Sequence, residues 1–348
     1  MGGVRMDKFF PSFFGNDILR TRLARAIKEQ KLPHAMLLEG CSGCGKKKLA
    51  TLLAAALECE GDLSSIPCGK CRRCRKILSG LSIDVTVIGK EDRATIGIDK
   101  IRALREDMHL TATESKNKIY IIDDAETLTQ EAQNALLISI EEPPPHVYIF
   151  LLCTNTETIL PTIKSRVQDV KLQKLSLGQL SEYLLSTSDV ARRLSENDKK
   201  TFNAILLSSN GTIGQALRLL EPKNTESLMK ERSVTDAIVE ALTKKTPFSV
   251  LYESMYALPQ KRQELSVSLA SISLALRDLI LLKQNEEAML LYHTDETHAK
   301  ETADNLGTRY LLALYDCIAS AEEECAQNTN ISSLLSALTN DLYACRSK

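Results

Sequence analysis

Residues 40–47 read Gly-Cys-Ser-Gly-Cys-Gly-Lys-Lys, a glycine-rich stretch that ends in two lysines. An apolar run, 36–38, precedes it and an Ala-rich helical pattern, 48–56, follows it, so the loop stands between a predicted strand and a predicted helix. In that setting glycines let successive backbone N–H groups surround phosphates, and the lysine reaches the outer phosphates. The sequence therefore predicts a phosphate-binding loop in an α/β domain, with a chance glycine-rich turn as the alternative. The nucleotide contacts expected from this loop are Gly40, Gly43, Gly45, Lys46 and Lys47.

The last position of the loop departs from the usual pattern. A phosphate-binding loop normally ends in Ser or Thr, whose hydroxyl holds Mg²⁺, but here the residue is Lys47. An ammonium group cannot coordinate a metal, and its charge repels Mg²⁺ from the same place. We expect the loop to keep the groups that bind ATP and to lack those for Mg²⁺-dependent hydrolysis.

Four neighbouring cysteines form the second motif. Cys68, Cys71 and Cys74 make two overlapping CxxC turns, and Cys59 adds a fourth thiol. Four thiolates are the ligand set of a closed structural zinc site, so the sequence predicts bound Zn²⁺, with a redox dithiol as the alternative. Basic residues around the cysteines would offset the negative charge of such a site, or alternatively contact DNA: Lys70, Arg72, Arg73, Arg75 and Lys76.

A buried strand that ends in carboxylates is the third motif. Residues 118–122 read Lys-Ile-Tyr-Ile-Ile, and Asp123 and Asp124 follow them. Beside a phosphate-binding loop, Asp123 would face Mg²⁺ and Asp124 would stand where related ATPases carry a longer catalytic Glu. An acidic helix N-terminus is the alternative. Two polar residues after the predicted strand 147–153 could sense a γ-phosphate or cap the next turn: Thr154 and Asn155.

Composition limits the functional classes. The chain has 348 residues, enough for two or three domains, and a formal net charge of −1. This charge gives no global attraction to nucleic acid or membranes, and no uninterrupted apolar run approaches the roughly 20 residues of a membrane span, so no membrane partner is expected. Residues 1–6 predict no secretory signal, and ten cysteines then indicate metal binding or free thiols in a reducing cytoplasm. The CxxC pair inside the loop, Cys41 and Cys44, is interpreted as small-residue packing.

The order of these motifs resembles one family. Besides the loop and the cysteines, the chain reads IYIIDDAETLTQEAQNALLISIEEPPP over 119–145 and LPTIKSRV over 160–167. This combination is similar to the AAA+ clamp-loader subunits of bacterial DNA polymerase III. The resemblance implies a parallel sheet flanked by helices with an inserted zinc module, then a helical lid, then an all-α collar through which five subunits join. We expect the AAA+ domain at 1–173 with the zinc module at 59–74, the lid at 174–222 and the collar at 228–348.

Within this family, zinc-module subunits are either the ATPase motors, gamma and tau, or the delta-prime stator. Three departures favour the stator: Lys47 replaces the hydroxyl, Asp124 replaces the catalytic Glu, and Gly214 stands where motors carry a phosphate-sensing arginine. Each departure removes a contact that would stabilise the charge developing on the phosphate during hydrolysis. One such contact contributes roughly 10²-fold to the rate. The family's Ser-Arg motif remains, as Ser165-Arg166, and it supplies an arginine finger in trans to a neighbour's ATP.

The resemblance thus implies a delta-prime-like stator with no intrinsic ATPase activity, within the DNA polymerase III holoenzyme. Its implied partners are gamma/tau and delta subunits in a hetero-pentamer, the sliding clamp and, through the complex, primer–template DNA. The alternatives are an active ATPase motor and a zinc-dependent nucleic-acid-binding module on a P-loop scaffold.

The remaining chain has the spacing of helices. Five apolar residues between 265 and 279 are spaced by four and three positions, which predicts one helix with an apolar seam. This seam would pack against a partner helix or in the chain's own core. The polar segment 221–226 is interpreted as a linker. The seam consists of Leu265, Leu269, Ile272, Leu276 and Leu279.

Overall fold

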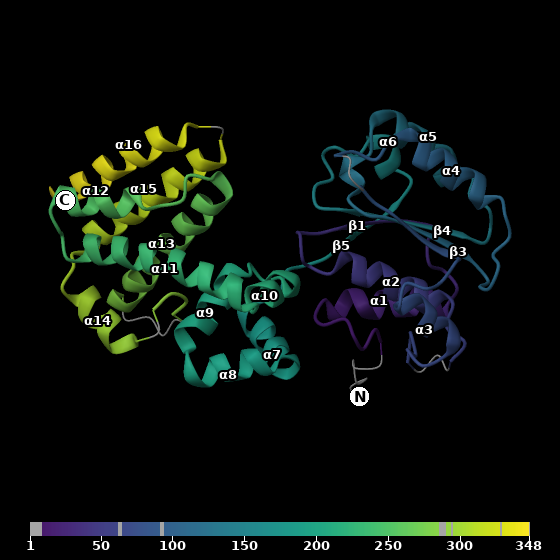
Figure 1. The fold of residues 1–348 in the computed structure, drawn as a ribbon, viewed down its shortest axis with the longest axis horizontal. Helices are drawn as coiled ribbons and strands as arrows, with labels where there is room; N and C mark the ends of the chain where they lie inside the picture. Colours follow the sequence, from purple (N-terminus) through teal and green to yellow (C-terminus); the bar gives the residue numbers. More distant parts are fainter. Residues whose placement is uncertain are drawn as a thin grey trace. The chain divides into compact units, whose positions relative to one another are not determined.

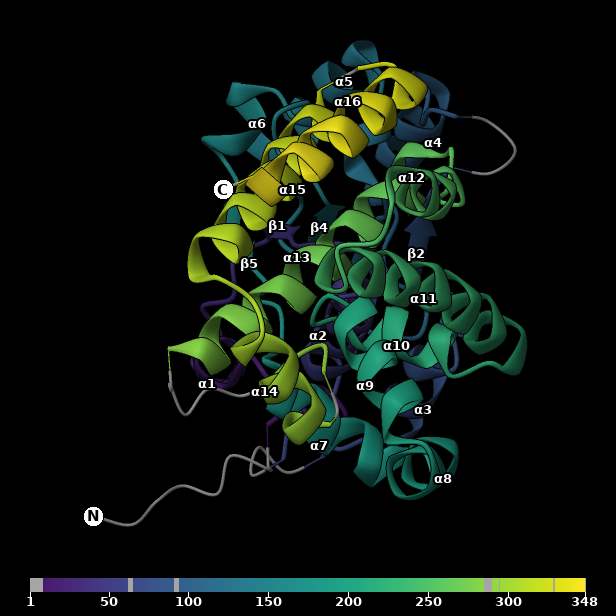
Figure 2. The same cartoon turned by 90° about the vertical axis from the view of Figure 1, so that its left-hand side faces the viewer.

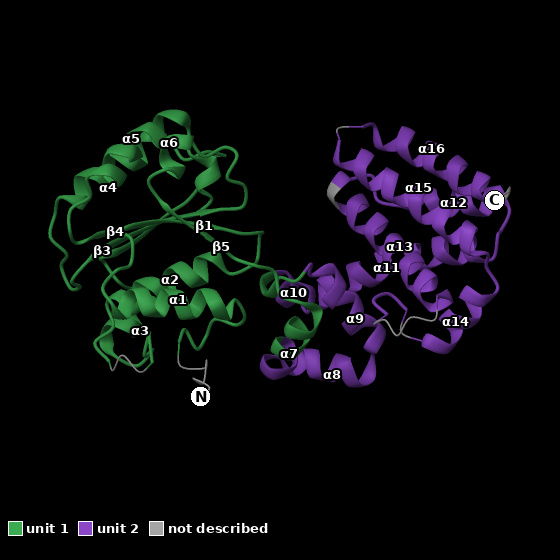
Figure 3. Cartoon of the chain, turned by 180° about the vertical axis from the view of Figure 1, so that it is seen from behind, with its two compact units in different colours: residues 1–183, 211–214 green, residues 184–210, 215–348 purple. Residues whose placement is uncertain are grey.

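The computed structural model describes residues 9–61, 65–90, 94–284, 290–293, 295–327 and 329–347. The chain divides into two compact units, Met1–Tyr183 with Gly211–Gly214, and Leu184–Asn210 with Gln215–Lys348 (Figure 3). The sequence-based prediction about a secretory signal, at residues 1–6, lies outside the described residues. The three-domain division with boundaries after 173 and 222 stays a prediction.

The first unit is an α/β domain built on a five-stranded sheet in the order β2-β3-β4-β1-β5 (Figure 1). Every strand pair is parallel. The three inner strands are buried on both faces, which explains why their sequences are apolar without alternation. The predicted α/β class is therefore confirmed. The strands are β1 (Ala35–Glu39), β2 (Val85–Ile88), β3 (Lys118–Ile122), β4 (Val147–Cys153) and β5 (Gln168–Lys171).

Helices cover both faces of this sheet (Figure 1). Successive residues of a strand point to opposite faces, so β1 sends Leu38 to one apolar cluster and Leu37 to the other. The first cluster is closed by α1 (Asp17–Lys28), α2 (Lys46–Leu57) and α3 (Arg72–Leu78). The second is closed by α4 (Ile98–Met108), η2 (Ala125–Thr127), α5 (Gln130–Glu141) and α6 (Pro161–Lys164).

Parallel pairing determines where functional side chains gather. The carboxyl ends of β1, β3 and β4 lie at one edge of the sheet, so the loops that follow these strands meet there. Those loops carry the phosphate-binding motif, the Asp pair and the Thr-Asn pair. The fold thus brings together the three motifs that the sequence places far apart.

The second unit is helical. In its core α13 packs against α15, α11 and α14, and α16 packs beside α15 (Figures 1 and 2). Its helices are α8 (Asp189–Asn197), α9 (Lys199–Ser208), α11 (Pro222–Thr243), α12 (Phe248–Tyr256), α13 (Arg262–Lys283), α14 (Glu296–Asp304), α15 (Thr308–Ala326), α16 (Ile331–Ala344) and η3 (Cys345–Ser347). Two helices contribute residues to both units: α7 (Leu177–Thr187) and α10 (Ile213–Leu219).

The predicted leucine seam lies on α13, and all five of its residues are fully buried in the core of this unit. The intramolecular alternative is therefore confirmed. The stretch Glu264–Lys283 is long and apolar enough to cross a membrane, with a mean hydropathy of 1.8, but half of it is buried inside the protein. Such burial is typical of a core helix in a soluble domain.

The interpretation of residues 221–226 as a linker is wrong. Glu221 precedes α11, and Pro222 occupies its first turn. Proline is well suited to that place because its fixed φ is helical and its missing N–H has no partner to lose. The hydroxyl of Thr225 donates to the Leu219 carbonyl oxygen at 2.6 Å, which ties this turn to α10.

Candidate functional site

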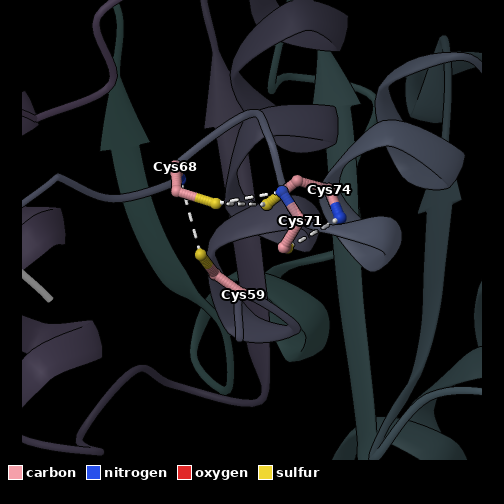
Figure 4. A group of neighbouring side chains, drawn as sticks. All are labelled: Cys59, Cys68, Cys71 and Cys74. Atoms are coloured by element: carbon pink, nitrogen blue, oxygen red, sulfur yellow. Dashed lines mark hydrogen bonds between the residues drawn. The ribbon is translucent and has the colours of Figure 1, made fainter. Parts of the chain in front are cut away.

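The four predicted cysteines form one cluster (Figure 4). Cys59 follows α2, Cys68 lies in the connecting loop, Cys71 caps α3 and Cys74 lies in its first turn. All four sulfur atoms lie within 4.8 Å of one another. The Sγ atoms of Cys68 and Cys74 are 3.9 Å apart, close to the ~3.8 Å that tetrahedral Zn–S bonds of 2.3 Å require.

Backbone N–H groups point at these sulfurs. The N–H of Cys71 donates to Cys68 Sγ, and the N–H of Cys74 donates to Cys71 Sγ, both at 3.4 Å. Donation from Cys71 and Lys70 lowers the pKa of the Cys68 thiol to about 6, which favours the thiolate that binds metal. Burial raises the pKa of Cys74, so this thiol needs a cation to ionise. The cluster fits a closed zinc site, and zinc itself stays a prediction.

A buried carboxylate joins the cysteine module to the sheet. Glu58, with a fully buried side chain, accepts hydrogen bonds from the backbone N–H groups of Lys116 and Asn117 at 2.8 and 3.0 Å. It also accepts one from the Asn117 side-chain amide at 2.6 Å and faces Arg73 at 3.4 Å. Residues 116–117 lead directly into β3, so this contact places the module against the strand that carries the Asp pair.

A second carboxylate holds the same loop. Asp84 accepts from the backbone N–H groups of Thr113, Glu114 and Ser115 at 2.7 to 2.8 Å. Burial acts to raise the pKa of Asp84, but these three donors outweigh it and the pKa is lowered. Sequence reasoning missed both anchors, because a lone Glu beside a cysteine and a lone Asp before a strand carry no distinguishing pattern.

The basic residues of the module are partly engaged by its own acids. Arg73 pairs with Glu60 at 3.1 Å as well as with Glu58, and Lys76 pairs with Glu114 at 2.5 Å. These pairs reduce the positive charge available to a nucleic acid. They favour a charge-balancing role for this face over the alternative of DNA contact.

The phosphate loop has the expected backbone. Gly43 and Gly45 have φ angles of 80° and 97°, a region that suits glycine, and Gly45 is the N-cap of α2. The ammonium group of Lys46, however, donates to the carbonyl oxygens of Gly40 and Cys41 at 2.6 and 3.1 Å. The lysine that would reach the outer phosphates is therefore turned onto its own loop.

Both carboxylates after β3 are paired with lysines. Lys47 Nζ lies 3.2 Å from Asp123 Oδ2, and Lys90 Nζ lies 3.1 Å from Asp124 Oδ2. The first pair joins the side chain that replaces the usual hydroxyl to Asp123, the acid predicted to face Mg²⁺. A tethered ammonium group thus stands where Mg²⁺ would bind, and the site does not fit the ion without displacing Lys47.

The two residues after β4 are also engaged. The backbone N–H of Thr154 donates to Glu126 Oε1 at 3.1 Å, and its hydroxyl donates to the same oxygen. Asn155 caps the next turn, because its Oδ1 accepts from the backbone N–H of Glu157 at 2.8 Å. Asn155 therefore caps the next turn, as the alternative prediction had it. Thr154 instead binds the carboxylate of Glu126, a residue that the sequence analysis did not include in the site.

Gly214 lies against the phosphate loop within the same unit. Its backbone N–H donates to the Gly43 carbonyl oxygen at 3.1 Å. A Cβ atom at this position would lie 3.0 Å from the Gly43 Cα. That distance is tighter than an ordinary contact, so a larger residue at position 214 would require the phosphate loop to shift by a few tenths of an ångström.

Replacing Lys47 with threonine should make ATP binding depend on Mg²⁺. The change frees Asp123 and restores a hydroxyl ligand, while Asp124 and Gly214 remain, so hydrolysis by the isolated chain should stay undetectable. Calorimetric titration with ATP, with and without Mg²⁺, measures the effect, which we expect to be about tenfold or more in Kd. The matched control is Lys48→Thr, one residue along the same lysine run. Mg²⁺-independent binding by Lys47→Thr would show that Lys47 does not occupy the metal position.

Arg166 lies apart from these contacts, after α6. Its Nε is 2.6 Å from Glu141 Oε1 at the end of α5, and its Nη1 donates to the Thr162 carbonyl oxygen and to Ser165 Oγ, both at 3.1 Å. The side chain is 42% exposed. It is available to another molecule, and its orientation is set by its own chain.

The sequence of this chain is similar to those of DNA polymerase III subunits. The family model described as "DNA polymerase III, delta subunit" matches residues 15–176. The gamma subunit of Buchnera aphidicola (subsp. Schizaphis graminum) is 32% identical over 61% of this chain and 57% of its own length. The delta-prime subunit of Bacillus subtilis is 27% identical over 91% of this chain and 92% of its own length.

The chain spans less than three fifths of the length of the gamma and tau relatives it first matches. A gamma subunit-related protein of Thermotoga maritima has a solved structure that covers 93% of this chain and 99% of its own, with a TM-score of 0.38 and 19% identity. The sequence matches carry the comparison. Residues 15–176 are similar to the DNA polymerase III delta-subunit family, and the chain is similar over most of its length to clamp-loader subunits of the delta-prime, gamma and tau kind.

Proposed function

We propose that the chain is a delta-prime-type stator of the clamp loader and not an ATP-hydrolysing motor. The observation that carries this proposal is the Lys47–Asp123 ion pair, 3.2 Å long, at the place where a motor holds Mg²⁺. Two further departures support it: Asp124 stands where a motor of the resembling family carries a catalytic Glu, and Gly214 stands where it carries an arginine. The near full-length match to a delta-prime subunit supports it as well.

In this role the chain acts on a neighbour. Arg166 would be presented to the γ-phosphate of ATP bound by an adjacent gamma/tau subunit, where a guanidinium group stabilises the charge that develops in phosphoryl transfer. The remaining partners are a delta subunit in the hetero-pentamer, the sliding clamp and primer–template DNA, all in the cytoplasm. The zinc module has a structural role, and the helical regions serve as lid and collar.

Replacing Arg166 with alanine should lower ATP turnover by the reconstituted complex and leave its assembly intact. An arginine finger contributes about 10³-fold or more at the site it serves. The other ATP sites of the complex keep their own fingers, so we expect a severalfold fall in total turnover, measured as phosphate release in the presence of clamp and primed DNA.

The matched control is Lys164→Ala, which removes an exposed cation from the same helix end. Normal turnover by the Arg166→Ala complex would disprove the finger assignment. Hydrolysis of ATP by the purified wild-type chain would favour the motor alternative.

A further inference from the structure

We propose that Glu141 is a positioning residue that holds Arg166 in the orientation needed to reach a neighbour's phosphate. This inference rests on the proposed role of Arg166 as a finger. It adds a second residue to that role, on a different helix, which the Ser-Arg motif does not contain.

The contacts around the guanidinium group are one-sided. Glu141 takes the Nε side at 2.6 Å, and Nη1 is held by the Thr162 carbonyl oxygen and Ser165 Oγ, both at 3.1 Å. Within the described part of the chain, Nη2 has no hydrogen bond. Because a guanidinium group is planar, fixing Nε and Nη1 also fixes the direction of Nη2. The Nη2 group of Arg166, which remains free to bind a phosphate oxygen, is thus oriented by the chain itself before a partner binds.

The position of Glu141 in its helix is unfavourable for an acid. It is the last residue of α5, where the negative end of the helix dipole repels anions, and the last turn holds no basic residue. A neutral or basic residue would suit the helix better. A carboxylate at this end therefore needs another explanation, and the 2.6 Å contact with Arg166 supplies one.

The pair contributes little to folding. Both side chains are more than two fifths exposed, 42% for Arg166 and 45% for Glu141. Ion pairs so exposed are weak stabilisers because water screens them. The benefit of the contact is orientation, which matters for a group that must meet a transferring phosphoryl group within a fraction of an ångström.

The two helices that carry Glu141 and precede Arg166, α5 and α6, are held together by the buried side-chain amide of Gln133. Gln133 of α5 donates to the Thr158 carbonyl oxygen at 3.0 Å and accepts from the backbone N–H of Leu160 at 2.8 Å. Leu160 directly precedes α6, so α5 and α6 are joined at one end by this amide and at the other by Glu141 and Arg166 (Figure 1). Glu141 therefore acts from a rigid support.

The test is a double-mutant cycle in the reconstituted complex, with steady-state ATP turnover as the readout. Glu141→Gln should lower kcat about twofold, less than Arg166→Ala does, with KM for ATP unchanged, because ATP binding at the neighbour is untouched and only the orientation of the guanidinium group is lost. Glu141→Asp should recover part of that loss. The control is Glu142→Gln, the adjacent acid, which has no ion pair among the described residues and should behave like wild type. All variants should melt at the wild-type temperature.

The decisive comparison is Glu141→Gln in the Arg166→Ala background. If Glu141 acts only through Arg166, the second change adds no further loss. An equal twofold loss in that background would overturn the positioning role in favour of a structural one. A rise in turnover by Glu141→Gln would also overturn it, since Glu141 would then be withholding the arginine. Normal turnover in Arg166→Ala would overturn the proposed function itself, whereas a normal Glu141→Gln beside a slow Arg166→Ala would overturn only this inference.

Discussion

Replacing Cys74 with serine should abolish zinc binding and unfold the cysteine module. Cys74 is fully buried and packs with Ile66 and Ile77 in the core that α2 and α3 share. A structural zinc site contributes about 10–16 kcal/mol in small zinc-binding peptides, which exceeds what a short loop and one helix can gain from packing. Loss of the metal therefore removes most of what holds the module together. Metal analysis of the purified protein should show one zinc per wild-type chain and none in the variant.

The same variant should melt about 10 °C or more below wild type, because several kilocalories per mole are lost from the first unit. Treatment of the wild-type chain with a strong chelator should reproduce this shift, since both changes remove the metal. Thermal unfolding followed by circular dichroism measures both effects in parallel samples.

The matched control for this experiment is the double variant Cys41→Ser/Cys44→Ser. These residues also form a CxxC pair, but they lie in the phosphate loop and do not belong to the cluster. Zinc content and melting temperature should stay near wild type. Zinc retained by Cys74→Ser, or lost equally from the loop variant, would contradict a four-cysteine site at Cys59, Cys68, Cys71 and Cys74.

The sequence could predict those features that depend on local order. The inner strands are covered on both faces, so their apolar runs lack alternation and stand out in the chain. The cysteine cluster was predictable because CxxC spacing brings two sulfurs together within one turn. The proximity of Lys47 to Asp123 was also predictable, because the loop after β1 and the end of β3 meet at one edge of the sheet.

Other features depend on contacts that no local pattern encodes. Thr154 binds Glu126 across 28 residues, and Glu58 binds Asn117 across 59. Such pairs are decided when the sheet aligns distant loops, after local preferences have already been satisfied. The polar segment 221–226 was misinterpreted for a related reason, because a charged first helical turn and a linker have the same composition.

Replacing Glu58 with alanine should destabilise the first unit by about 3–5 kcal/mol, because it leaves two backbone N–H groups and one side-chain amide without their acceptor and removes one of the two acids that face Arg73. The side chain is fully buried and serves two backbone N–H groups, one side-chain amide and Arg73. The affected residues, Lys116 and Asn117, lead into β3. Urea denaturation measures the loss, and amide exchange of these two residues should accelerate in the same variant.

The matched control is Glu60→Ala, which removes the other acid that faces Arg73. Its side chain is 49% exposed and its contact with Arg73 is 3.1 Å long, so the expected loss is below about 1 kcal/mol. Zinc content should be measured for both variants, because Glu58 adjoins Cys59 and a lost metal would mimic a lost anchor. If Glu58→Ala keeps its zinc and is still strongly destabilised, the carboxylate stabilises the junction by itself. A loss no larger than that of Glu60→Ala would mean that the loop before β3 is held by Asp84 alone.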